Sequence, residues 1–206
     1  SHRCFVAEVM GRKCGYLSLM SGLATGAEKV YLNEEGITLA GLAADSERMV
    51  ESFRSGRSLY LVIRNERASV NYTTDVLAHI FAEEGKGLYD VREAILGHQQ
   101  QGGSPTAFDR IMATKLVAHS LELLACALKR GEPTASYVGL MGGKVSDQPL
   151  DRMNDDLDRD HRRPRHQWWL GLRPAVGLVS QDIGTLTLQD VPDFGEAVDD
   201  AASDQR

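Results

Sequence analysis

Cysteines are scarce in this sequence, and the three that occur share no spacing. Cys4, Cys14 and Cys126 are far apart and odd in number, which fits neither a pair of metal ligands nor a disulfide framework. Free thiols persist in a reducing compartment. We therefore expect three reduced cysteines and a cytoplasmic protein.

Positive net charge and long apolar runs are also missing. The formal net charge is -6, which argues against a general nucleic-acid binder but leaves room for a local basic pocket that takes a phosphorylated metabolite. No apolar run reaches the length of a membrane span, and no signal peptide is visible. We expect neither nucleic acid nor membrane as a partner. Without an initiator Met before Ser1, we also expect the chain to be part of a longer protein.

Segments with the character of strands alternate with segments of helical periodicity. Strands are expected at 4–9, 29–32, 59–63, 90–96 and 137–141, and helices at 15–26, 38–54, 74–84 and 107–129. The apolar run 59–63 is continuous, as in a strand that is covered on both faces. This alternation predicts an α/β fold, with a mainly parallel sheet and helices on both faces.

The second half of the chain offers fewer patterns. We expect the helix 107–129 to contribute core positions, namely Ile111, Met112, Leu116, Leu121, Leu124 and Leu128. Residues 151–166 are charged and expected to be irregular, whereas Trp168 and Trp169 are expected to act as packing anchors. From Gln189 onward the chain is acidic and poor in core residues. We therefore expect a domain over 1–188 and an acidic disordered tail over 189–206.

The stretch 94–110 organises the rest of the chain. A strand, expected to be buried, ends at His98 and is followed by three amides, Gln99, Gln100 and Gln101, a Gly-Gly-Ser-Pro turn and a helix start. Open α/β sheets bind ligands at the carboxyl ends of their strands, beside helix N-termini that favour anions. We therefore expect a binding site around His98, although a structural histidine at a strand end gives the same pattern.

A second strand end carries the turn Met10-Gly11-Arg12, which suits an anion. Glycine at such a turn is also common for backbone reasons alone. Glu66 follows a third strand and could accept hydrogen bonds from sugar hydroxyls, or it could be an ordinary exposed acid. Arg162 could add a bidentate phosphate contact, but it lies in a charged run that suits solvent equally well. No histidine has metal-ligand spacing.

Two further arginines precede these strand ends. Arg3 lies seven residues before Met10, and Arg92 lies six before His98. Side chains at opposite ends of one strand cannot both reach one small ligand. If Arg3 or Arg92 binds this ligand, it does so from a neighbouring subunit; taken alone, both read as solvated arginines.

Together these residues resemble the ATP-dependent 6-phosphofructokinase family. The segments that carry the resemblance are 9–17, 22–27 and 96–110, the last reading Leu-Gly-His-Gln-Gln-Gln-Gly-Gly-Ser-Pro-Thr-Ala-Phe-Asp-Arg. More narrowly, the segments 64–66, 71–75, 83–87 and 167–174 are similar to the C-terminal, regulatory half of the duplicated eukaryotic enzyme. The resemblance implies a partial phosphofructokinase domain.

The resemblance implies a sugar-phosphate site that is shared across an interface of a homo-oligomer, a tetramer. The residues that match the family's contacts are Arg3, Met10, Gly11, Arg12, Glu66, Arg92, His98, Gln99, Gln100, Gln101 and Arg162. In the regulatory half the ligand is fructose 2,6-bisphosphate. In a catalytic half the same pocket holds fructose 6-phosphate.

Two positions that depart from the family pattern bear on the choice between a regulatory and a catalytic half. The family's ATP- and magnesium-binding segments are also missing. Gln101 stands where catalytic halves usually have an arginine, which favours the regulatory ligand, whereas Arg12 resembles the catalytic turn. The family's glycine-rich ATP loop and its magnesium-binding and catalytic aspartates are not in this sequence. We therefore expect no catalytic or metal-binding residue here, and an inactive chain within an ATP- and Mg²⁺-dependent parent kinase. A degenerate half that serves only assembly is the third alternative.

Overall fold

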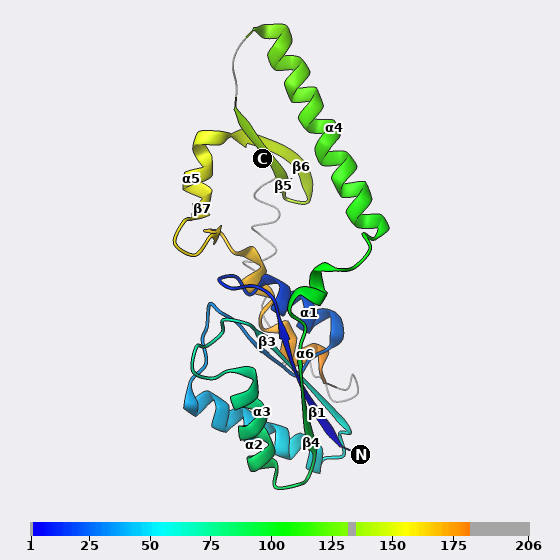
Figure 1. Ribbon diagram of the computed structural model, residues 1–206, viewed down its shortest axis with the longest axis vertical. Coiled ribbons are helices and arrows are strands. Elements are labelled where there is room, and N and C mark those ends of the chain that lie inside the picture. The colour runs from blue at the N-terminus through cyan, green and yellow to red at the C-terminus, as the bar shows by residue number, and fades with distance from the viewer. Residues whose placement is uncertain (1, 132–134, 182–206) are drawn as a thin grey trace. The chain divides into compact units, whose positions relative to one another are not determined.

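The computed structural model describes residues 2–131 and 135–181 (Figure 1). Within these ranges the chain forms two compact units, one of residues 2–102 with 169–181 and the other of residues 103–168. The proposed tail at 189–206 lies outside the described residues. Each unit is described by itself.

The first unit is built on a four-stranded parallel sheet. Its strands are β1 (Arg3–Val9), β2 (Lys29–Tyr31), β3 (Leu59–Asn65) and β4 (Asp90–Ile95), in the order β2-β3-β1-β4. Arg3 pairs with both Leu59 and Asp90, and Glu8 pairs with both Arg64 and Ile95. The three longer strands therefore run in step and end at the same edge of the sheet.

Helices cover both faces of this sheet, as predicted. On one face, α2 (Leu39–Arg54) and α3 (Thr74–Gly85) bury Leu42, Phe53 and Phe81 against alternate residues of the strands. On the other face, α1 (Tyr16–Thr25) and α6 (Ala175–Val179) pack with η3 (Trp168–Leu172). Trp169 is 3% exposed here and packs edge-on against Tyr16, so it is an anchor, whereas Trp168 is 49% exposed.

Local signals explain where the helices of this unit begin and end. The Thr38 hydroxyl accepts the N–H of Gly41, and Thr73 caps α3 in the same way, so both helices begin with a side-chain cap. Gly26 ends α1 in the left-handed conformation, which glycine adopts without steric cost. The predicted element boundaries in this unit therefore hold to within about two residues, the usual uncertainty of helix and strand ends.

The second unit joins a long helix to a hairpin. The helix α4 (Ala107–Arg130) starts at a capping box between Thr106 and Asp109. The strands β5 (Ser136–Met141) and β6 (Lys144–Pro149) pair antiparallel across a Gly-Gly turn. The charged stretch that follows contains η2 (Leu150–Arg152), α5 (Met153–Asp156) and the two-residue strands β7 (Leu157–Asp158) and β8 (Arg163–Pro164). This stretch, predicted to be irregular, thus contains short regular elements, and no sequence pattern predicts β6.

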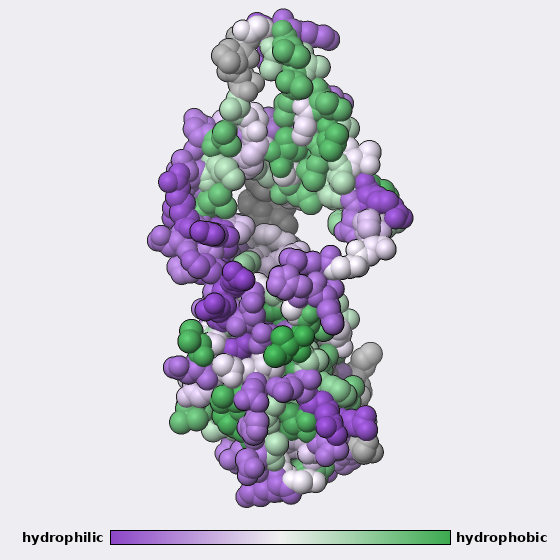
Figure 2. Space-filling model, viewed as in Figure 1, coloured by the Kyte–Doolittle hydropathy of each residue, from purple (hydrophilic) through white to green (hydrophobic). Residues whose placement is uncertain are grey.

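Two burial predictions are wrong. The α4 positions assigned to the core are exposed or half-buried, and the described part of this unit holds no buried residue before Trp169; apolar side chains are visible along α4 in Figure 2. On β4, Ile95 is 63% exposed because this strand forms the edge of the sheet.

By length and composition, the helix α4 is also long and apolar enough to cross a membrane. It is 24 residues long, and an 18-residue window has a mean hydropathy of 1.5 with none of its residues buried. By length and composition, α4 is therefore an exception to the prediction that no segment could span a membrane. His119 on this helix nonetheless contacts Asp147 of β6 at 2.9 Å, so one side of α4 packs on protein.

Candidate functional site

The candidate site lies at the carboxyl edge of the parallel sheet. The strands β1, β3 and β4 end there at Val9, Asn65 and Ile95. Each is followed by a loop that carries predicted site residues. Parallel alignment therefore gathers three segments that are distant in sequence, and ligands of open α/β sheets bind at this edge.

Gly11 and Glu66 connect two of these loops. The backbone N–H of Gly11 donates to Oε1 of Glu66 at 3.1 Å, and the N–H of Glu66 donates to the carbonyl of Val9 at 3.0 Å. Gly11 has a φ of +130°, and a Cβ there would lie 2.4 Å from the Cys14 carbonyl oxygen. The turn therefore requires glycine, which confirms the backbone reason for its presence without excluding a ligand.

Arg12 follows in the same turn. Its Nε lies 4.0 Å from Oε1 of Glu66, and its side chain is 77% exposed against 28% for Glu66. At this separation and exposure the ion pair adds little stability. The guanidinium therefore keeps its donors available to an anion, and the Glu66 carboxylate can accept from a hydroxyl group beside it.

The segment with His98 lies next to the same turn. Residues 97–101 form η1 (Gly97–Gln101), and the N–H of Met10 donates to Oε1 of Gln100 at 3.0 Å. The N–H of Leu96 also donates to the carbonyl of Glu8 at 3.1 Å. The members of η1 that follow Gly97 are all exposed, namely His98, Gln99, Gln100 and Gln101. The segment after β4 therefore contacts the turn at Met10 through Gln100, and membership of His98 in the site stays a prediction.

Arg3 and Arg92 lie away from this edge, on one face of the sheet. Arg3 begins β1, about 20 Å of strand before Val9. Arg92 pairs with Phe5, which lies two residues beyond Arg3 and therefore on the same face of β1. Both arginines are exposed. Arg3 is therefore too far from the carboxyl edge of its own sheet to contact a small ligand there, whereas Arg92 lies three residues before the end of β4.

Arg162 belongs to the second unit. It lies in the connection between β7 and β8 with a φ of +52°, a left-handed conformation that non-glycine residues adopt infrequently. The preceding His161 contacts Asp158 at 2.7 Å, which fixes this tight turn. Membership of Arg162 in the site stays a prediction.

Sequence reasoning missed the residues that hold these loops. The side chain of Arg64 is 1% exposed and donates to Glu8 and to three backbone carbonyls of the 66–72 loop. Asn65 donates to the Cys14 carbonyl at 3.1 Å, on the other face of the strand. The available signal was an Arg-Asn pair that directly continues a fully apolar strand, where two polar side chains must find buried partners.

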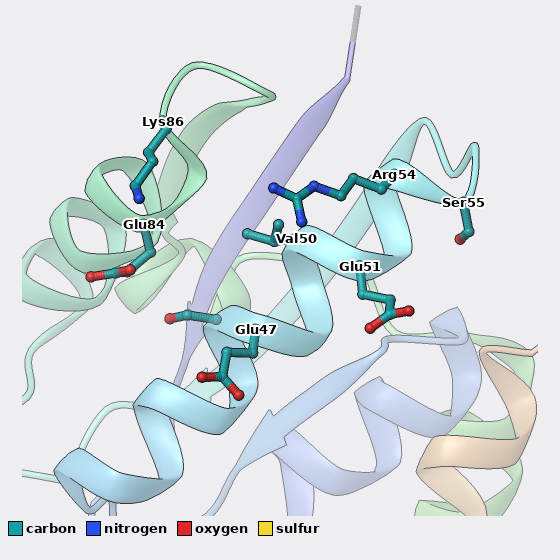
Figure 3. A pocket seen from close by; sticks show the side chains of 8 residues that line it. Glu47, Val50, Glu51, Arg54, Ser55, Glu84 and Lys86 are labelled. Atoms are coloured by element: carbon teal, nitrogen blue, oxygen red, sulfur yellow. The ribbon is translucent and has the colours of Figure 1, made fainter.

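Two hollows in the first unit differ in their relation to this edge. One of about 340 Å³ is lined by residues of the edge itself, among them Glu8, Glu66 and Thr74. A larger one of about 690 Å³ lies between α2 and α3 (Figure 3). Its lining mixes the acids Glu47, Glu51 and Glu84 with the cations Arg54 and Lys86, and these side chains point in different directions rather than converging on one point. Size alone therefore does not identify the binding site.

Two other buried titratable groups, Asp45 and Cys4, lie away from this edge and are structural. Burial alone would raise the pKa of Asp45, but hydrogen bonds from Lys29, Tyr31 and Arg48 outweigh it and hold that pKa below its usual value. Burial also raises the pKa of Cys4 to about 12, which makes this thiol unreactive. In the described residues, no three His, Cys, Asp or Glu side chains gather in a way that could hold a metal ion.

The fold defines an α/β protein with a candidate polar site at the ends of its parallel strands. Residues 1–124 match the family model for phosphofructokinase. The chain belongs to the phosphofructokinase family.

Relatives extend this match over most of the chain. The chain is 39% identical over 189 residues to the muscle-type ATP-dependent 6-phosphofructokinase of Canis lupus familiaris, which covers 87% of this chain and 24% of that enzyme. It is 43% identical over 192 residues to the ATP-dependent 6-phosphofructokinase of Dictyostelium discoideum, with coverage of 92% and 22%. The chain thus spans about a quarter of the length of these relatives.

Solved structures give the same result. The phosphofructokinase from Saccharomyces cerevisiae is similar with a TM-score of 0.80 at 33% identity, over 87% of this chain and 25% of that one. The Pichia pastoris phosphofructokinase in the T-state has a TM-score of 0.76 at 30% identity, over 90% and 23%. The α/β fold predicted from sequence is therefore confirmed.

Proposed function

We propose that this chain is part of an ATP-dependent 6-phosphofructokinase and forms its allosteric site for fructose 2,6-bisphosphate. The site is the carboxyl edge with Met10, Gly11, Arg12, Glu66 and the segment 97–101. ATP and Mg²⁺ bind to parts of the enzyme outside this chain. The parent enzyme is a cytoplasmic homo-oligomer, a tetramer, that converts fructose 6-phosphate to fructose 1,6-bisphosphate.

The observation that carries this proposal is the juxtaposition of an acid and a cation across two loops. Glu66 accepts the N–H of Gly11 at 3.1 Å and stands 4.0 Å from Arg12. A sugar phosphate needs a carboxylate for its hydroxyls and a guanidinium for its phosphate. The exposed His98 and Gln101 on the adjoining segment extend the set of donors toward the same edge.

The arrangement of Arg3 and Arg92 favours a site that is completed by a second copy. They lie on adjacent strands, on one face of the sheet, and both are exposed. Two arginines on one surface can bind one phosphate together. Because Arg3 is about 20 Å of strand away from the carboxyl edge of its own sheet, the ligand that it binds together with Arg92 is held by the neighbouring subunit. Arg162 completes the set of cations.

The regulatory assignment depends on Gln101. The resemblance assigns an arginine to this position in catalytic halves. The amide of Gln101 therefore removes one positive charge from the contacts to the 6-phosphate. Arg12 favours the opposite assignment, because the turn Met10-Gly11-Arg12 resembles that of a catalytic half. A catalytic half that holds fructose 6-phosphate in the same pocket is therefore the second candidate.

Ligand choice in the full-length protein tests this assignment. We expect fructose 2,6-bisphosphate to bind more tightly than fructose 6-phosphate, and Gln101→Arg to shift the ratio of the two dissociation constants toward fructose 6-phosphate by about tenfold, the effect of one charge-assisted hydrogen bond. Gln148→Arg makes the same replacement of glutamine by arginine on β6. It is the matched control and should leave the ratio of the two dissociation constants unchanged. Tighter binding of fructose 6-phosphate by the unaltered site would favour the catalytic half.

Two further measurements separate the remaining alternatives. The purified chain should not phosphorylate fructose 6-phosphate with ATP and Mg²⁺, because phosphoryl transfer needs a metal, cradled phosphates and a positioned base; measurable turnover contradicts this. If Arg12→Ala and His98→Ala left both regulation and catalysis of the full-length enzyme unchanged while truncation broke the oligomer, the chain would serve assembly alone.

A further inference from the structure

We propose that Arg64 is a positioning residue that sets the geometry of the sugar-phosphate site by holding the loop of Glu66 in place. This inference rests on the proposed function and deepens it, because it assigns a role at that site to a residue that touches no ligand. Arg64 is 1% exposed, so its side chain offers no surface to a sugar.

Arg64 has the position that this role requires. It is the penultimate residue of β3, two residues before Glu66, and it pairs in register with Glu8 of β1. The side chains of Glu8 and Arg64 therefore share one face of the sheet. Nη1 of Arg64 donates to Oε2 of Glu8 at 2.7 Å, and Glu8 also accepts the Thr74 hydroxyl at the start of α3. The guanidinium is thereby fixed to two elements of the core.

From this fixed point the guanidinium reaches three carbonyls of one loop. Nη1 donates to the Glu66 carbonyl at 3.2 Å, Nη2 to the Ser69 carbonyl at 2.7 Å, and Nε to the Tyr72 carbonyl at 3.1 Å. Four of the five guanidinium N–H groups are therefore placed among Glu8 and this loop. A rigid planar fork with several acceptors fixes the path of the backbone that it contacts.

The path of this loop determines where the Glu66 carboxylate stands. The Glu66 backbone is held at its N–H by Val9 and at its carbonyl by Arg64. Its side chain then meets the Gly11 N–H and the Arg12 guanidinium. Without the Arg64 contacts the 66–72 loop loses three of its carbonyl partners, and Oε1 of Glu66 loses its fixed distance to Gly11.

The test compares single and double variants of the full-length protein. Arg64→Lys keeps the charge beside Glu8, but an ammonium group has three donors on a flexible stem and cannot serve four acceptors. We expect Arg64→Lys to weaken binding of fructose 2,6-bisphosphate by about tenfold, as for loss of hydrogen bonds to a charged group, with the KM for ATP unchanged. Arg64→Met should weaken it further.

Arg57→Lys is the matched control. Arg57 precedes the other end of β3 and also joins a carboxylate, Glu28, to a backbone carbonyl, that of Ser180. It is remote from the carboxyl edge, so the same substitution there should leave sugar-phosphate affinity unchanged. An equal loss of affinity in both variants would mean a general loss of stability and would overturn the proposal.

A double-variant cycle with Glu66→Gln gives the decisive comparison. If Arg64 acts through Glu66, Arg64→Lys should cause little further loss of affinity in the Glu66→Gln protein. If Arg64→Lys reduced the affinity by the same factor in the wild-type and the Glu66→Gln protein, the positioning role of Arg64 would be overturned. If Glu66→Gln alone left affinity unchanged, the proposed function would fail instead. Hydrogen exchange of the peptide that contains Gly11 then tests the positioning by itself: faster exchange in Arg64→Lys supports it, and unchanged exchange overturns it.

Discussion

The backbone N–H of Gly11 donates to Oε1 of Glu66 at 3.1 Å, so the turn after β1 is hydrogen-bonded to a side chain in the loop after β3. Each loop therefore limits the freedom of the other. The candidate site consequently depends on backbone geometry as much as on the charges that line it.

Gly11→Ala should disrupt this turn. The φ of +130° is unfavourable for alanine, and the added Cβ would meet the Cys14 carbonyl oxygen at 2.4 Å and Nδ2 of Asn65 at 2.8 Å. Backbone strain of this kind costs about 1–3 kcal/mol, and the clash adds to it. We expect a loss of unfolding free energy above that range, measured by denaturant titration of the full-length protein, together with weaker sugar-phosphate binding.

Gly56→Ala separates strain from clash. Gly56 has a similar φ of +105°, but a Cβ there meets nothing within 4 Å. This variant should lose only the cost of the strain and should bind sugar phosphate normally. Equal losses of stability in the two variants would contradict a role for the contact with Cys14.

Asp45→Asn should destabilise the protein in a manner that depends on pH. Asp45 is buried and accepts from Tyr31 at 2.7 Å and Lys29 at 2.9 Å. Because its folded-state pKa is lowered from 3.8, its charged form contributes stability above that pH, and this contribution is lost as the pH falls below it. We expect a loss of about 1–3 kcal/mol at neutral pH that shrinks below pH 3.8.

Glu47→Gln is the control for this prediction. Glu47 lies on the exposed side of the same helix, where substitutions usually change stability by less than about 0.5 kcal/mol. Acid and neutral denaturant titrations of both variants give the comparison. A difference between wild type and Asp45→Asn that stayed constant down to pH 2 would contradict the assignment of the stabilisation to the carboxylate.

The exposed leucines of α4 should cause the purified chain to self-associate. Leu121 is 59% exposed and Leu128 is 74% exposed, and apolar surface of this extent favours association. Burying one leucine contributes about 1.5–3 kcal/mol. The double variant Leu121→Gln with Leu128→Gln should therefore weaken self-association at least about tenfold, measured by sedimentation velocity. Glu122→Gln on the same helix should not; a monomeric wild-type chain would contradict the prediction.

The first unit was largely predictable from sequence because its signals are local. An apolar run followed by Arg64-Asn65, or a threonine before a helical period at Thr38, reports structure within a few residues. Parallel pairing then follows from the alternation of strands and helices. The loops at Met10, Glu66 and His98 could be expected at one edge for the same reason.

Burial and tertiary contacts were less predictable, because they depend on partners that are distant in sequence. The leucine period of α4 indicates an apolar face but not what covers it, so its residues were assigned to a core that the described unit lacks. Ile95 resembles a buried strand residue, yet β4 is an edge strand. Likewise, the sequence around Arg64 gives its charge but not the four acceptors that surround it. Residues of a candidate site could be proposed from the sequence, whereas the residues that position their loops could not.

The last two residues of β3 face opposite sides of the sheet, and each serves a different loop. Exchanging Arg64 with Asn65 would preserve composition, charge and strand length. It would nevertheless turn the guanidinium toward the Cys14 carbonyl and leave Glu8 facing an amide. The order of these two residues thus determines which face of β3 carries the guanidinium. A shift of β3 by one residue would break the contacts of both loops at once.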